Sequence, residues 1–135
     1  MALMTWSDQL SVSIEKIDSQ HMKLVDLLNG FHDAMKLGKG KEAMAKTLSE
    51  LLDYTVYHFG TEEEFFRKYG YPAFATHKKE HEALTIKAKD LSERFSRGEP
   101  VISAETMTFL KNWLQDHIMG SDKKYGPFLN AKGVH

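Results

Sequence analysis

Two pairs of residues spaced four positions apart could bind a metal ion: His58 with Glu62, and His77 with His81. On an α-helix, residues four apart project from nearly the same side, so each pair would point two donor groups in one direction. Imidazole nitrogens and carboxylate oxygens are good ligands for transition metals. Either pair alone is more often an ordinary solvated pair, so the case for a metal depends on whether the two pairs meet.

The composition limits what else the chain could do. It has 135 residues, of which 41% are hydrophobic, as is usual for one globular domain with a buried core. Its 18 Lys and Arg residues against 19 Asp and Glu leave a formal net charge of -1, so we expect neither nucleic acid nor an anionic membrane as a partner. There is no cysteine, so histidine, carboxylate or water must hold any metal.

The N-terminal residues have neither the basic region nor the apolar region of a secretory signal. No later run approaches the roughly 18 apolar residues that a membrane span needs. We therefore expect a cytoplasmic protein without a membrane span. Residues 1–135 are expected to form a single domain that works as a monomer.

The spacing of apolar residues predicts four amphipathic helices, at about 18–37, 41–69, 73–97 and 103–119, and a short segment at about 121–125. Gly and Pro residues interrupt the pattern between them. Asp18 is predicted to cap the first helix. The residues before it lack a helical period and are expected to form an extended arm, with Trp6 packed over the core. An irregular tail is expected from Gly126 and Pro127 onward.

The third predicted helix is highly charged around His77, which by itself would favour a solvated face. The two histidines nevertheless continue directly into the apolar stripe of that helix, which consists of Leu84, Ala88, Leu91 and Phe95. Because both imidazoles fall on this stripe, we expect them to be buried while the lysines between them point outward.

Short loops between four such helices predict an all-α, up-down-up-down antiparallel four-helix bundle with an N-terminal extended arm. Alternating helix directions would then bring Glu62 and five histidines to one end of the bundle: His21, His58, His77, His81 and His117. Clustered buried imidazoles without a partner would leave many polar atoms unsatisfied, which is unfavourable. Together these residues therefore predict a metal site much more strongly than either pair does alone.

The motifs Gln20-His21, His58-Phe59-x-x-Glu62, His77-x-x-x-His81 and His117-x-x-x-x-Asp122 resemble those of the hemerythrins, in particular their single-domain bacterial branch. The resemblance extends from Trp6 to Tyr125. It implies a non-haem di-iron centre that binds O2 reversibly. By the same resemblance, His77, His81 and His117 would hold one iron, His21 and His58 would hold the other, and Glu62 and Asp122 would bridge the two.

A count of ligands agrees with this resemblance. Two octahedral irons offer about twelve coordination positions, and five histidines, two bridging carboxylates and a bridging oxo or hydroxo group leave one position open. Ferritin-like bundles that activate O2 use about four Glu and two Glu-x-x-His motifs, which are absent here. The lower carboxylate count favours O2 as a ligand that can be released.

The open position falls on the iron with two histidines, and helical spacing predicts an apolar pocket around it, lined by Leu24, Phe59, Trp113, Leu114 and Ile118. The family resemblance places a leucine over the O2 site three residues before the last histidine ligand, and Leu114 has that position. The alternative is that Leu114 is only a core residue.

Regular helix geometry conflicts with the last two ligands. His117 and Asp122 are five residues apart, which leaves them roughly 140° apart around an α-helix and unable to face one cluster. We therefore predict that the helix widens or breaks near Gly120. Two other residues are not expected to be ligands. His32 should lie near the other end of the core, and Glu63 should be solvated, although it could contact a ligand from outside.

We expect O2 storage, delivery or buffering, without separate catalytic residues and with a possible O2-consuming protein as recipient. The alternatives are O2 or redox sensing, and a di-iron activity that consumes peroxide or nitric oxide. A weaker alternative is a structural zinc site. A sensor would need an output surface, and a chain of this length leaves little room for one.

Overall fold

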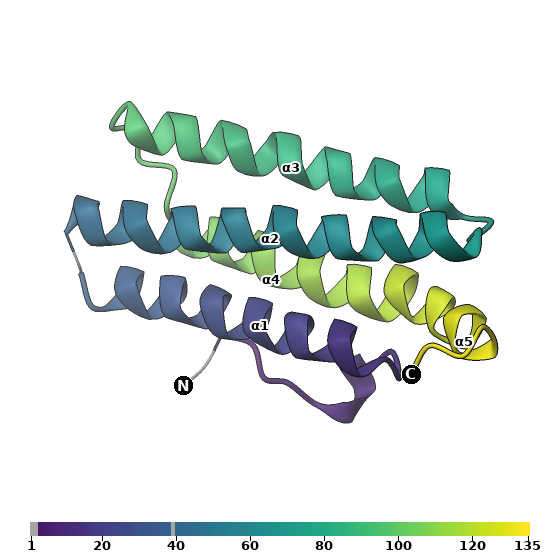
Figure 1. Cartoon of the computed structure of the whole chain (residues 1–135). Coiled ribbons are helices and arrows are strands. Elements are labelled where there is room, and N and C mark those ends of the chain that lie inside the picture. The colour runs from purple at the N-terminus through teal and green to yellow at the C-terminus, as the bar shows by residue number, and fades with distance from the viewer. Residues whose placement is uncertain (1–2, 39) are drawn as a thin grey trace.

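The computed structural model describes residues 3–38 and 40–135, and it contains helices and no strand within those ranges. The four long helices are α1 (Glu15–Lys36), α2 (Lys41–Tyr69), α3 (Phe74–Ser96) and α4 (Ala104–His117). They run alternately up and down in an antiparallel bundle, with α1 beside α2 and α2 beside α3 (Figure 1). The predicted all-α four-helix bundle is therefore confirmed. None of the described helices is long and apolar enough to cross a membrane.

The first helix begins earlier than predicted, at Glu15, and its N-cap position is Ile14. Asp18 lies inside the first turn, where its carboxylate accepts hydrogen bonds from Ser11 Oγ at 2.5 Å and from the backbone N–H of Val12 at 2.8 Å. The prediction of Asp18 as N-cap was wrong because this carboxylate binds the chain that precedes the helix. It still places a negative charge near the positive end of the helix dipole, which is favourable.

The N-terminal arm includes the short 3-10 turn η1 (Asp8–Leu10) and packs on the bundle. The side chain of Asn29 in α1 pairs with the backbone of Met4, accepting from its N–H at 2.9 Å and donating to its carbonyl at 2.8 Å. Trp6 is half-buried against the main apolar cluster, as predicted.

The C-terminal segment is helical, in contrast to the irregular tail predicted. A π-helical turn, η2 (Ile118–Asp122), follows α4 and leads directly into α5 (Lys123–Ala131), which includes Gly126 and Pro127. Tyr125 and Leu129 are fully buried in α5. Their tertiary packing outweighs the helix-breaking tendency of Gly and Pro.

The core has two apolar clusters, and a group of buried polar side chains lies between them. One cluster includes Leu24 of α1, and the other includes Ile17 of α1, Phe66 of α2 and Tyr125 of α5. His21 falls between Leu24 and Ile17 along α1. The helices therefore place polar side chains inside an otherwise apolar interior, near the end where α2 meets α3 and α4 meets α5 (Figure 1).

Candidate metal centre

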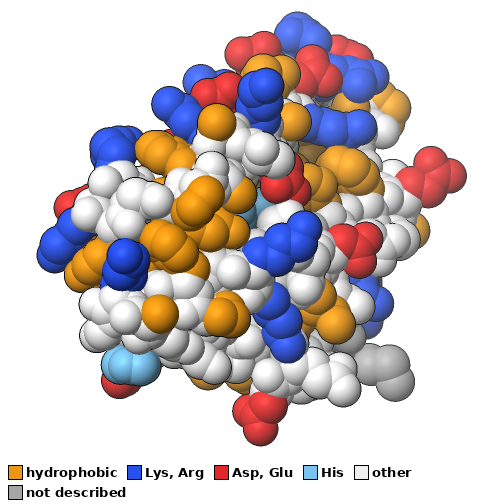
Figure 2. All heavy atoms as spheres, turned by 90° about the vertical axis from the view of Figure 1, so that its right-hand side faces the viewer, with side chains coloured by type: hydrophobic (Ala, Val, Ile, Leu, Met, Phe, Trp, Pro, Cys, Tyr) orange, Lys and Arg blue, Asp and Glu red, His pale blue; other side chains and the backbone are white. Residues whose placement is uncertain are grey.

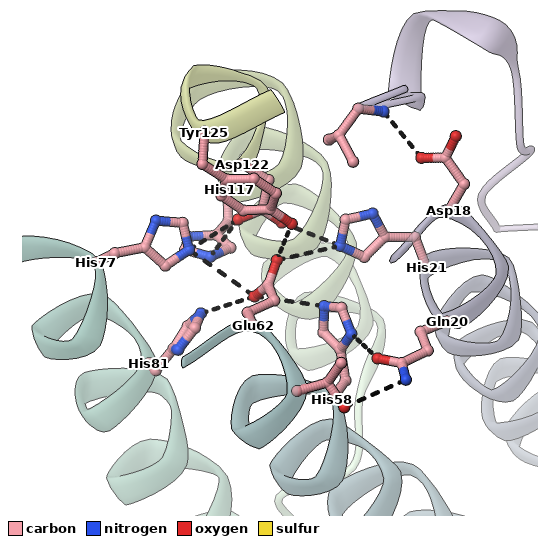
Figure 3. Close-up of polar contacts among 12 residues, drawn as sticks. Asp18, Gln20, His21, His58, Glu62, His77, His81, His117, Asp122 and Tyr125 are labelled. Carbon is pink, nitrogen blue, oxygen red and sulfur yellow. Dashed lines mark hydrogen bonds and ion pairs between the residues drawn. The ribbon is translucent and has the colours of Figure 1, made fainter. Parts of the chain in front are cut away.

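Five histidines and two carboxylates converge inside the bundle (Figure 3). His21 comes from α1, His58 and Glu62 from α2, His77 and His81 from α3, His117 from α4, and Asp122 from η2. Their exposed fractions range from 0% to 6%. Seen from the right-hand side of Figure 1, the molecular surface shows little histidine (Figure 2). The antiparallel arrangement thus brings together all seven residues that the sequence singled out.

The π-helical turn explains how His117 and Asp122 can face the same centre. The five residues Ile118–Asp122 form this turn, and Gly120 is its middle residue. A π-turn holds more residues per turn than an α-helix, so two residues five apart return to one side. The predicted widening near Gly120 is confirmed.

The donor atoms form two overlapping groups, and the atoms within each group lie within 4.8 Å of one another. The group that we call the three-histidine position contains His77, His81 and His117, and the two-histidine position contains His21 and His58. Glu62 and Asp122 belong to both. The two positions therefore share their carboxylates.

Asp122 shows this sharing most clearly. Its Oδ1 lies 2.9 Å from His77 Nε2 and 3.1 Å from His117 Nε2, while its Oδ2 lies 3.0 Å from His21 Nε2. One oxygen thus faces each position. Glu62 Oε1 lies 3.1 Å from His81 Nε2 and 3.5 Å from His58 Nε2.

The buried donor atoms lack hydrogen-bond partners within the described residues, although several lie close together. The unpaired atoms include Nε2 of His21, His77, His81 and His117, Oε1 of Glu62 and both carboxylate oxygens of Asp122. Leaving so many buried polar atoms unsatisfied is costly, and metal coordination would satisfy them. This donor set, with neutral imidazoles and carboxylates and no thiolate, fits borderline or hard divalent metals.

The electrostatics of the protein without a metal also indicate a cation site. Burial alone would lower the pKa of His21, but hydrogen bonds and charges from Asp122 and Glu62 outweigh it and raise that pKa to about 9. The pKa of His77 is raised to about 9 for the same reasons. Burial opposes ionisation of Asp122, yet its histidine partners hold its pKa well below the usual range. Without a metal, protons bound to the histidines therefore balance the negative charge of the two carboxylates. A bound cation would displace these protons.

The outer nitrogens of two histidines have hydrogen-bond partners that orient the rings, and that of a third lies near a carboxylate. His58 Nδ1 donates to Gln20 Oε1 at 2.7 Å, and His81 Nδ1 donates to Glu63 Oε2 at 3.0 Å. His117 Nδ1 lies 3.4 Å from Glu80 Oε1. These contacts leave Nε2 of each ring facing the centre. Glu63 was expected to be solvated, with contact to a ligand as the alternative, and the structure shows that contact. Glu80 was not predicted because the charged stretch around it resembled a solvated face.

Tyr125 is the other residue that sequence reasoning missed. Its phenol donates a hydrogen bond to Glu62 Oε2 at the core of the cluster. Burial, followed by the charges of Glu62 and Asp122, raises its pKa well above the usual value, so it stays a neutral donor. Its position three residues after Asp122 was a usable signal, since residues three apart share a helix face.

An apolar cavity of about 50 Å³ adjoins the two-histidine position. It reaches His21 and His58 of that position, together with His117 and Asp122. Its other lining residues are Leu24, Leu28, Leu51, Leu52, Thr55, Phe59, Leu84, Ala88, Leu110, Trp113 and Leu114. Since roughly 10–15 Å³ can hold a water molecule, this space is large enough for a diatomic gas.

Four of the five predicted pocket residues line this cavity: Leu24, Phe59, Trp113 and Leu114. Ile118 does not, because the first residue of the π-turn projects into the main apolar cluster, where it is fully buried. His32 belongs to neither donor group, as expected. It is half-buried in α1, and its Nδ1 has no hydrogen-bond partner within the described residues.

The fold and the donor set define a metal-binding four-helix bundle. The family description "Hemerythrin HHE cation binding domain" matches residues 12–129. The chain is 40% identical over 132 residues to a bacteriohemerythrin of Methylococcus capsulatus, covering 97% of this chain and 100% of that protein. It is 38% identical to a bacteriohemerythrin of Stenotrophomonas maltophilia, covering 97% and 84% of the two chains.

Solved structures agree with these sequence matches. A crystal structure of wild-type hemerythrin has a TM-score of 0.89 and 38% identity to this chain, covering 93% of this chain and 97% of that one. The chain therefore belongs to the hemerythrin family.

Proposed function

We propose that this protein binds O2 reversibly at a non-haem di-iron centre. In this proposal His77, His81 and His117 hold one iron, His21 and His58 hold the other, and Glu62 and Asp122 bridge them. The observation that carries the assignment is the set of buried Nε2 and carboxylate oxygens that have no hydrogen-bond partner in the described part of the chain, in which one oxygen of Asp122 faces each position. When bound, the iron pair would supply the electrons and the open coordination site for O2.

The chain contributes an O2 site that excludes water. The cavity beside His21 and His58 is lined mainly by aliphatic and aromatic side chains. A polar pocket would stabilise charge separation and favour loss of O2 as a reduced species. The apolar walls therefore favour binding and release of intact O2.

The cavity also favours binding over catalytic turnover. Reduction of O2 or peroxide consumes protons, which a nearby acid must supply. Apart from the proposed ligands, Thr55 carries the one hydroxyl among the described residues that line this cavity, and that hydroxyl donates to the Leu51 carbonyl at 2.7 Å. No other carboxylic acid, histidine or lysine side chain lines it among those residues. We therefore propose an O2-binding protein, with consumption of peroxide or nitric oxide as the alternative reaction.

Measurement of O2 uptake tests this function. The reduced, iron-loaded protein should take up one O2 per pair of irons and release most of it under vacuum over several cycles. Stoichiometric consumption of O2 without release would instead indicate an oxidase or a rapidly autoxidising centre.

We further propose that residues 1–135 act as a single-domain cytoplasmic monomer that stores, delivers or buffers O2 for a consuming protein. One chain supplies all seven donor residues, so the proposed centre needs no second subunit. Size-exclusion chromatography of the iron-loaded protein and fractionation of cells test the oligomeric state and the location.

A further inference from the structure

The two metal positions differ in the charge of the groups that contact the outer nitrogens of their histidines. At the three-histidine position, His81 Nδ1 donates to the carboxylate of Glu63. His117 Nδ1 lies 3.4 Å from the carboxylate of Glu80 but makes no hydrogen bond to it or to any other described residue. At the two-histidine position, His58 Nδ1 donates to the neutral amide of Gln20. His21 Nδ1 is buried and has no hydrogen-bond partner in the part of the chain that the structure describes.

The neutral partner at the two-histidine position is held in place. Gln20 Nε2 donates to Thr61 Oγ1 at 3.3 Å, and the Thr61 hydroxyl donates to the Tyr57 carbonyl at 3.3 Å. This chain of hydrogen bonds orients the amide so that its oxygen, and not its nitrogen, faces His58 (Figure 3). Gln20 therefore orients the ring without adding a negative charge.

The carboxylates of Glu63 and Glu80 differ in how strongly each should affect a metal ion at the three-histidine position. The Glu63 side chain is 15% exposed and makes a hydrogen bond of 3.0 Å, so solvent screens its charge weakly. The Glu80 side chain is 40% exposed, and the oxygen near His117 also accepts a hydrogen bond of 2.7 Å from Ser121 Oγ. We expect Glu63 to have the larger effect on a bound metal.

A carboxylate that accepts the Nδ1–H of a ligating imidazole makes the opposite nitrogen a stronger ligand, and its charge compensates that of the cation. Glu62 and Asp122 contribute to both positions, so they do not explain a difference between them. We infer that the three-histidine position binds a divalent cation first and more tightly, and that Glu63, assisted by Glu80, increases this preference beyond the effect of the additional histidine. The inference rests on the metal centre of the proposed function but does not require O2 binding.

Titration with cobalt(II) tests this inference without redox chemistry. Metal-free protein is titrated in competition with a chelator, which yields two stepwise affinities, and anomalous diffraction from crystals with one equivalent of cobalt locates the first ion. In the unmodified protein, this ion should lie between His77, His81 and His117. Removal of such outer partners typically weakens metal binding by about 10- to 100-fold, so Glu63→Gln should weaken the first affinity by about 10-fold or more. Glu80→Gln should weaken it less.

The matched controls are Glu64→Gln on α2 and Glu82→Gln on α3, because both remove the same charge from exposed neighbours of Glu63 and His81. They should leave both affinities within about two-fold, as expected for screened surface charges. The second affinity should remain within the same range in Glu63→Gln.

The inference would be overturned by cobalt entering first between His21 and His58, by equal weakening of both steps in Glu63→Gln, or by an effect of the controls as large as that of Glu63→Gln. Two equal affinities in the unmodified protein would also overturn it. None of these results would exclude reversible O2 binding, and failure to release O2 would leave the order of metal loading unchanged.

Discussion

Tyr125 in α5 donates a hydrogen bond to Glu62 in α2, and so ties the C-terminal helix to the centre of the metal site. The phenol contacts Oε2, while Oε1 of the same carboxylate faces His81 and His58. Oε2 also faces His21, at 3.8 Å from its Nε2, so the neutral donor orients Glu62 with both oxygens toward the cluster (Figure 3).

The first prediction concerns this hydrogen bond. Tyr125→Phe keeps the ring packed but frees the buried Glu62 oxygen, so iron should leave the loaded protein about 10-fold faster or more. Transfer of iron to a chelator measures this rate. Tyr71→Phe is the control, because it removes a hydroxyl from a neighbouring ring. That ring packs edge-on against the Tyr125 ring, with 6.2 Å between the two ring centroids. Equal iron retention in both variants would show that the phenol does not stabilise the centre.

The shared carboxylates should be essential for holding two metals. Either Glu62→Ala or Asp122→Ala leaves the cations under-compensated in a buried site, so each variant should contain less than the full amount of iron. Metal analysis after purification measures the loss. Asp116→Ala, which alters an exposed carboxylate one residue before His117, should retain normal iron. A Glu62 or Asp122 variant with two irons and an unchanged spectrum would disprove the bridging role.

Leu114 should protect bound O2 from solvent. It lines the cavity beside the two-histidine position, so Leu114→Ala should admit water and anions. At matched iron content, we expect faster autoxidation in air and faster azide binding. Leu91→Ala truncates a half-buried core leucine that is not part of the cavity and should change stability without changing these rates. Unchanged rates in a less stable Leu114→Ala protein would show that Leu114 only packs the core.

The fit between the N-terminal arm and α5 depends on a glycine. A Cβ atom at Gly126 would lie 2.6 Å from the carbonyl oxygen of Val12, so Gly126→Ala must displace the arm. We expect a loss of about 1–3 kcal/mol in the free energy of unfolding, as for other overpacked sites. Gly60→Ala meets no atom within 4 Å and should be stabilising by about 0.5–1 kcal/mol. Denaturant unfolding of both variants compares them, and equal stability would contradict the close approach.

The sequence predicted the middle of the fold better than its ends. The predicted range 41–69 coincides with α2, and the predicted range 73–97 exceeds α3 by one residue at each end. Strong apolar periodicity and Gly or Pro breaks mark these helices locally. The start of α1 and the presence of α5 depend instead on contacts between distant segments, such as Asp18 with the arm and Tyr125 with Glu62.

The candidate site shows the same division. Helical spacing and alternating helix direction predicted that the five histidines and Glu62 would meet, and the five-residue spacing of His117 and Asp122 predicted the widened turn. The partners of the histidine Nδ1 atoms depend on side-chain rotamers across helices, which the periodicity of one helix does not specify. Glu80, in a charged stretch that resembled a solvated face, was missed for this reason, whereas Tyr125 contacts Glu62 and could have been found from its spacing to Asp122.

The visible absorption spectrum of the purified, reduced protein, recorded under vacuum, then in air and again under vacuum, is the most direct test of a reversible di-iron O2 site. Iron is measured in the same samples. We expect two irons per chain, a visible band that appears in air and its disappearance when O2 is removed. One metal per chain, zinc in place of iron after growth with sufficient iron, or a spectrum that does not respond reversibly to O2 would contradict this function.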